Sequence, residues 1–153
     1  MEHNLKSNNK VKETAVRPSG LEKTGWVLVF LMALLQGIYA LYAFIDPAAF
    51  AGVRGTALLF SGDADWVRIY ASRTVFVALI IGYLLYQRHY RILVWAALFG
   101  TVMPITDAYL AYEANAANKV VYKHIATVIY LILTSIVLSK VSNNTQGAPQ
   151  HDI

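Results

Sequence analysis

Four long apolar runs, separated by short polar segments, dominate the pattern of the chain. The runs cover residues 26–45, 66–86, 92–112 and 120–138. A helix needs about 20 apolar residues to cross a hydrocarbon core of ~30 Å, and each run is that long. The pattern therefore predicts an all-α, four-helix transmembrane bundle within residues 25–139. Outside it we expect a polar N-terminal tail (1–24), an outer loop (46–65) and a disordered polar C-terminal tail (140–153).

The composition supports a membrane protein. Of the 153 residues, 57% are hydrophobic and only 14% are charged, and the mean hydropathy is +0.45. These values are too apolar for a soluble domain of this size. The chain has no cysteine, which excludes disulfides, thiol catalysis and cysteine-ligated metal centres. The first run lacks a convincing small-residue cleavage site, so we expect a retained helix rather than a signal peptide.

Lysine and arginine placement predicts the orientation. Cytoplasmic segments carry an excess of these residues. With four spans, both tails and the middle turn share one side, which holds Lys6, Lys10, Lys12, Arg17, Lys23, Arg88, Arg91 and Lys140. The other side holds Arg54, Arg68, Lys119 and Lys123. We therefore expect an integral, multi-pass protein of the cell membrane with both termini in the cytoplasm.

The same asymmetry bears on partners. The net charge of +4 favours contact with anionic lipid headgroups, so membrane lipids are expected partners. Nucleic-acid binding would need a clustered basic face with interleaved aromatic residues, and the chain has none. We expect no nucleic-acid partner, whereas a homo-oligomer is left open.

Four polar side chains within the spans fall in the same half of the predicted bundle. With a rise of ~1.5 Å per residue, Arg73 lies about 10 Å from the outer boundary and Asp107 about 8 Å. His124 lies about 6 Å from it and Gln36 about 14 Å. All four are in the outer half of the bundle. We therefore predict a polar cluster in which Arg73 and His124 approach Asp107.

Helical spacing adds neighbours to this cluster, because residues three or four apart share a face. Gln36 shares its face with Tyr39, Arg73 with Tyr70, and His124 with Thr127. Pro104, three residues before Asp107, should loosen the third helix and free a carbonyl. We expect a small polar cavity, with Asp107, His124 and Arg73 as candidate catalytic residues and with candidate ligand-binding residues Gln36, Tyr39, Tyr70 and Thr127.

A structural explanation of the same residues is also open. A lone charge in the membrane costs at least ~2.5 kcal/mol, so Arg73 and Asp107 would pair simply to fix the helix register. His124 would then be a solvated imidazole near the interface. No second His or Cys supplies a metal-ligand spacing, so the sequence predicts no metal and no cofactor.

The loop over residues 46–65 is too apolar for an ordinary linker. Asp46 followed by Pro47 is typical of a helix start, so "PAAFAGVRG" is expected to form a short turn in the outer interface, above the polar cluster. It would act as a lid or, the interpretation we favour, as a connector that covers helix ends.

Four segments together resemble a known family. They are "DPAAFAG" after the first run, "YASRTVFVALIIG" in the second, "MPITDAYLAY" in the third and "KHIATVIYLIL" in the fourth. The layout resembles a bacterial and fungal family of small four-helix membrane proteins, a domain of unknown function, and more loosely the DoxX-like proteins. The resemblance covers about residues 25–139 and matches Arg73, Asp107 and His124 to polar positions of the family. Thr74 stands where an acidic residue often follows the arginine.

Two classes of function follow from these residues. In one, the protein binds a small lipophilic molecule, or is an enzyme that does acid/base chemistry on a quinone, terpenoid or polyketide-like substrate. Asp107 and His124 would transfer protons, and Arg73 would set the pKa of the Asp107 carboxylate. In the other, it is a structural or accessory membrane subunit. A transporter is disfavoured, because no broken-helix repeat is visible.

Overall fold

Helices make up nearly all of the computed structural model, which describes residues 19–60 and 62–146. Within these residues there is no strand, so the all-α prediction is confirmed. The helices, in chain order, are α1 (Gly20–Ile45), α2 (Pro47–Arg54), α3 (Asp63–Tyr86), α4 (Tyr90–Gly100), α5 (Val102–Glu113) and α6 (Asn118–Gln146).

Four segments are long and apolar enough to cross a membrane: Gly20–Ile45, Asp63–Tyr86, Tyr90–Glu113 and Asn118–Asn144. The third combines α4 and α5. Each contains one of the apolar runs of the sequence, as predicted. The first and last helices also include residues 20–24 and 140–146, which were expected to belong to the tails. The predicted tails otherwise fall on residues 1–18 and 147–153, which lie outside the described ranges, and on Ser19. The protein is therefore a multi-pass membrane protein with four candidate spans.

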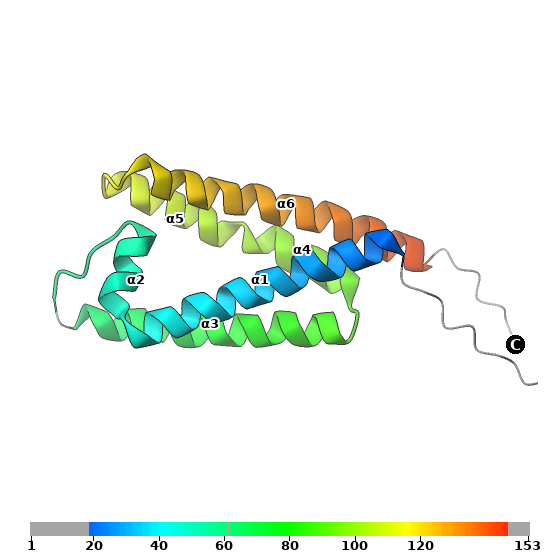
Figure 1. Ribbon diagram of the computed structural model, residues 1–153, viewed down its shortest axis with the longest axis horizontal. Coiled ribbons are helices and arrows are strands. Elements are labelled where there is room, and N and C mark those ends of the chain that lie inside the picture. The colour runs from blue at the N-terminus through cyan, green and yellow to red at the C-terminus, as the bar shows by residue number, and fades with distance from the viewer. Residues whose placement is uncertain (1–18, 61, 147–153) are drawn as a thin grey trace, which may run out of the picture.

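The spans pack as two pairs. α1 lies along α3, and α6 lies along α4 and α5 (Figure 1). Between them is a core that contains Val29, Met32, Leu93, Leu131 and Leu138. Large apolar side chains also cover the outside, where Leu41 is 61% exposed and Leu79 68%. Helices that are apolar all round are suited to lipid rather than to water.

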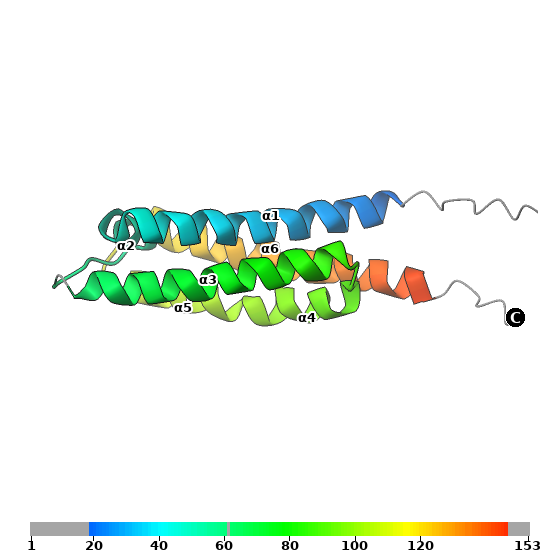
Figure 2. The same ribbon diagram turned by 90° about the horizontal axis from the view of Figure 1, so that it is seen from below.

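The third span is broken at Thr101. α4 ends at Gly100, α5 begins at Val102, and the break is visible in the view from below (Figure 2). The cause is Pro104, which has no backbone N–H to give to the preceding turn. The carbonyl left without its usual donor is that of Gly100, one turn before the proline. At the break, the Oγ1 of Thr101 donates to the Leu98 carbonyl at 2.7 Å. The predicted loosening of this helix is confirmed.

The predicted helix start after the first span is also confirmed. The Asp46 carboxylate accepts from the Ala49 N–H at 2.9 Å, and Pro47 takes the first helical position. Gly55 ends α2 with a φ of 85°, a conformation that favours glycine. Phe50 is buried against α1 and α3. α2 is thus a packed connector at the end of the bundle opposite the start of α1 (Figure 1).

The orientation of the bundle stays a prediction, and single cysteines can test it. We expect a membrane-impermeant thiol reagent to label Gly62→Cys from outside intact cells but not His89→Cys. Both positions are exposed, and a Cβ at Gly62 meets no atom within 4 Å. His89 lies in the turn between the second and third spans. Labelling of His89→Cys alone would reverse the predicted orientation.

Candidate functional site

An ion pair between Arg54 and Asp107 forms the centre of the candidate site. Nη2 of Arg54 contacts Oδ1 of Asp107, which joins the last residue of α2 to the middle of α5. The two side chains are only 14% and 19% exposed. Charges this far from water need a partner, because an unpaired one is strongly destabilising.

Aromatic rings hold the guanidinium in place. Nη1 of Arg54 donates a hydrogen bond to the Tyr70 hydroxyl at 2.9 Å. The guanidinium carbon also lies 5.3 Å from the centre of the Tyr70 ring and 5.6 Å from that of Phe50, within range of cation–π attraction. Contacts with Phe50 on α2 and Tyr70 on α3 therefore hold the Arg54 side chain in the position where it pairs with Asp107 on α5.

His124 completes the cluster from α6. Its Nδ1 lies 3.8 Å from Oδ2 of Asp107, longer than a hydrogen bond, and the side chain is 5% exposed. Its Nε2 is buried and has no hydrogen-bond partner among the described residues. An unsatisfied buried polar atom costs roughly 1–3 kcal/mol. This nitrogen therefore has room for a further partner, although the Arg54 backbone also approaches the imidazole.

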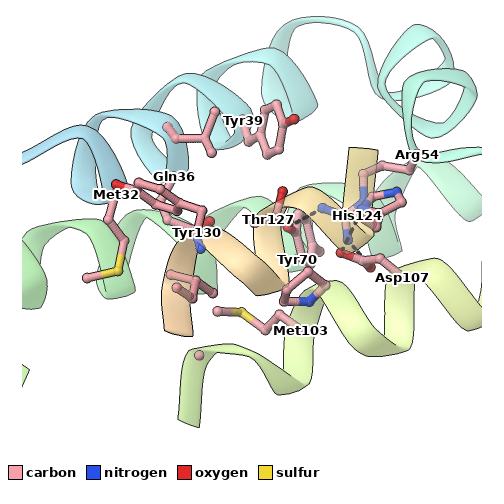
Figure 3. A pocket seen from close by; sticks show the side chains of 14 residues that line it. Met32, Gln36, Tyr39, Arg54, Tyr70, Met103, Asp107, His124, Thr127 and Tyr130 are labelled. Atoms are coloured by element: carbon pink, nitrogen blue, oxygen red, sulfur yellow. Dashed lines mark hydrogen bonds and ion pairs between the residues drawn. The ribbon is translucent and has the colours of Figure 1, made fainter. Parts of the chain in front are cut away.

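These residues border an internal space, here called the polar cavity, of about 50 Å³. One water needs roughly 10–15 Å³ of such space, so the polar cavity has room for a few waters but not for a large ligand. Side chains from five helices and Gly100 surround it (Figure 3). They are Met32, Leu35, Gln36, Tyr39, Arg54, Tyr70, Met103, Pro104, Asp107, His124, Thr127, Tyr130 and Leu131.

A second space, here called the apolar groove, borders the same ion pair. It has a volume of about 250 Å³. Arg54, Tyr70 and Asp107 line both spaces. The rest of the groove is mainly apolar and is formed by Phe50, Ala51, Thr56, Leu58, Trp66, Val67 and Leu110. The ion pair therefore borders both a small polar space and a larger apolar one.

Most residues predicted from depth and spacing do come together. Asp107 and His124 approach each other, and Gln36, Tyr39, Tyr70 and Thr127 all line the polar cavity (Figure 3). Their role in binding stays a prediction. Asp107 and His124 are the two side chains in the cavity lining of the kinds that hold metals. No group of three His, Cys, Asp or Glu side chains is found within the described ranges.

The predicted contact between Arg73 and Asp107 is wrong. Arg73 is exposed, and it forms no ion pair in the part of the chain that the structure describes. The reason is its position around α3, whose buried side includes Ala71, Thr74 and Ile81. Arg73 is one residue from Thr74, and each residue turns the helix by about 100°. Arg73 has a depth along the span that suits contact with Asp107, but its side chain points away from the buried side of α3.

Arg54 takes the place predicted for Arg73, and sequence reasoning assigned it only to the outer interface. A usable signal was present. The helix start at Asp46–Pro47 and the stop at Gly55 delimit a short helix, in which Phe50 and Arg54 are four residues apart and share a face. An apolar ring on that face predicts packing on the bundle, which would carry Arg54 inward.

These features define a class: a four-span integral membrane protein with a buried Arg–Asp–His cluster at one end of the bundle. A family model described as a domain of unknown function, DUF4267, matches residues 31–138, and the chain belongs to this family. No curated protein and no solved structure gives a significant match. The looser likeness to the DoxX-like proteins is not supported by the family match.

Removing the Tyr70 hydroxyl tests the hydrogen bond from Arg54. We expect Tyr70→Phe to lower the free energy of unfolding by about 1.5 kcal/mol, because the bond involves a charged donor in a partly buried site. Thermal unfolding in detergent measures the change. Tyr109→Phe is the matched control, since Tyr109 is 61% exposed on α5 and should be nearly neutral. Equal losses in the two variants would contradict the assigned bond.

Proposed function

We propose that this protein binds a small amphiphilic molecule at the α2 end of the bundle. The observation that carries the proposal is the shared wall: Arg54, Tyr70 and Asp107 line both the polar cavity and the apolar groove. A ligand in the groove would contact apolar side chains along its body and charged groups at its head. Sites for small molecules commonly combine a mainly apolar lining with a few polar groups.

The sizes of the two spaces indicate how such a ligand lies. The polar cavity, at about 50 Å³, accepts waters or a small polar group, whereas the groove of about 250 Å³ accepts a larger apolar part. Trp66 is 71% exposed at the edge of the groove, so this space opens to the surroundings of the bundle. A lipophile would therefore enter from the membrane interface without crossing the core.

A membrane-embedded enzyme is the second candidate, and the geometry of His124 favours it. Its Nε2 lacks a partner among the described residues, and its Nδ1 faces Asp107 at 3.8 Å. A carboxylate behind an imidazole stabilises the imidazolium that forms when the other nitrogen takes a proton. His124 would remove a proton from a weakly acidic O–H or C–H group of the substrate, and the substrate anion would be stabilised by Arg54.

A purely structural role explains less. The ion pair between Arg54 and Asp107 would hold α2 against α5 with no ligand present. That role gives no reason for a buried histidine nitrogen without a partner. It also gives no reason for an apolar groove that ends on two charged side chains.

Native mass spectrometry tests the proposal. We expect the wild-type protein, released from mild detergent, to carry a defined small lipophile that Asp107→Asn loses. Arg73→Gln is the matched control, because it removes an exposed charge at similar depth and should retain the molecule. The melting temperature of each variant separates ligand loss from unfolding. If no variant carries a molecule and Asp107→Asn melts far lower, the cluster is structural.

A further inference from the structure

Positive charge exceeds negative charge at the candidate site. Lys123, next to His124 on α6, donates from Nζ to the Val53 carbonyl at 2.6 Å. This places a second cation beside the end of α2, where Arg54 binds Asp107. The carbonyls at the end of α2 offset part of the Lys123 charge. Arg54 and Lys123 thus place two positive charges near the end of α2, and Asp107 is the one carboxylate that pairs with either of them among the described residues.

Hydrogen-bond donors also exceed acceptors there. A guanidinium has five N–H donors, and the described partners of the Arg54 side chain are Asp107 and the Tyr70 hydroxyl. The Tyr70 oxygen accepts from Arg54, so its own hydrogen remains available for another acceptor. The Asp107 carboxylate, in contrast, is already engaged by Arg54 and faces His124.

The two residues that carry these donors line the space where a ligand would bind. Arg54 and Tyr70 both line the apolar groove, and Arg54 is 14% exposed in its side chain. A head group that enters the groove would meet the guanidinium and the phenol hydroxyl together. Both prefer an oxyanion, which accepts charge-assisted hydrogen bonds that are about twice as strong as neutral ones.

We propose that the ligand is an anionic amphiphile, with a carboxylate or phosphate head bound by Arg54 and Tyr70 and an apolar tail against Phe50, Leu58 and Trp66. This inference rests on the proposed function and names the charge of the ligand. The anion would bring the site to two negative charges against Arg54 and Lys123. Low polarity around the groove strengthens that attraction relative to water.

Probes that differ only in the head group test the charge. The purified protein, in a neutral maltoside detergent at mildly alkaline pH, is titrated with dodecanoate, dodecyl phosphate, dodecanol and dodecylamine. Native mass spectrometry measures the bound fraction, and the melting temperature measures stabilisation. We expect the two anions to bind about tenfold more tightly than dodecanol and the amine to bind least. The stronger anion identifies the head group. Acetate and inorganic phosphate, which lack the tail, should give no shift.

Lys123→Gln tests whether the charge of Lys123 contributes to the preference for anions, and it leaves the ion pair of Arg54 and Asp107 in place. We expect it to reduce the affinity for the anions severalfold and to leave dodecanol binding unchanged. Lys119→Gln is the matched control, since Lys119 is an exposed lysine in the first turn of α6. The double variant Arg54→Gln/Asp107→Asn removes both charges of the pair together, so that neither is left buried and unpaired, and it should lose the anion preference.

Several results would overturn the inference. Equal binding of dodecanol and dodecanoate, or preference for the amine, means that the site does not select an anion, although an amphiphile still binds. A co-purified neutral lipophile with no binding of the anionic probes leads to the same conclusion. If no molecule co-purifies and no probe binds, the proposed function fails together with this inference.

Discussion

Replacing Asp107 by leucine is expected to lower the free energy of unfolding by about 3 kcal/mol. The variant leaves the guanidinium of Arg54 with no carboxylate, in a position where its side chain is 14% exposed, and an uncompensated buried charge is costly. Reversible unfolding in mixed micelles measures the loss. Arg54→Leu should cost a similar amount, because it leaves the Asp107 carboxylate unpaired in the same way.

The double variant distinguishes a direct pair from two independent sites. We expect Arg54→Leu/Asp107→Leu to be more stable than the sum of the single losses predicts, with a coupling of roughly 1–3 kcal/mol, as for residues in contact. The control cycle combines Asp107→Leu with Arg73→Leu, whose side chain is exposed, and its losses should add. Additive losses for Arg54 and Asp107 would contradict the ion pair.

A side chain at Gly55 should also be strongly destabilising. Gly55 ends α2 with a φ of 85°, and a Cβ there would lie 3.0 Å from carbon atoms of Ala111, Ala116 and Val120. Both the backbone conformation and the lack of space oppose Gly55→Ala, which we expect to cost about 2 kcal/mol. The same unfolding measurement applies. Larger residues should cost more, and they should displace Arg54 from Asp107.

Gly52→Ala is the matched control within the same short helix. A Cβ at Gly52 meets no atom within 4 Å, and its conformation is helical. Alanine there should stabilise α2 by up to about 1 kcal/mol, because glycine is a poor helix former. Opposite signs at the two glycines would support the packed position of α2. Equal and small effects would indicate that the C-terminal end of α2 does not pack against α5 and α6.

Much of the fold could be predicted from the sequence, because a membrane imposes simple rules on length and polarity. The four apolar runs coincide with the spans, and Pro104 coincides with the break at Thr101. The start of α2 is equally predictable, since Asp46 caps the helix by a local hydrogen bond and Pro47 fits its first position. Each of these features depends on neighbours in the chain.

The site was only partly predictable. Depth along the helices predicts that Asp107, His124 and Gln36 lie in the same half of the bundle, and all three line the polar cavity. The wrong partner, Arg73, arose because depth does not fix direction around a helix axis. Arg54 was missed because its place depends on how α2 packs across α1 and α3, a contact between segments that no local pattern describes. The volumes of both spaces likewise follow only from packing.

The division of the bundle into two pairs has a practical consequence for this cluster. Arg54 and Tyr70 come from the first half of the chain, whereas Asp107 and His124 come from the second, and the turn at residues 87–89 is the boundary. Neither half alone contains a complete cluster. Two separately expressed fragments, cut in that turn, would rebuild it only by associating, so fragment complementation in a living membrane becomes a direct reporter of how the halves recognise each other.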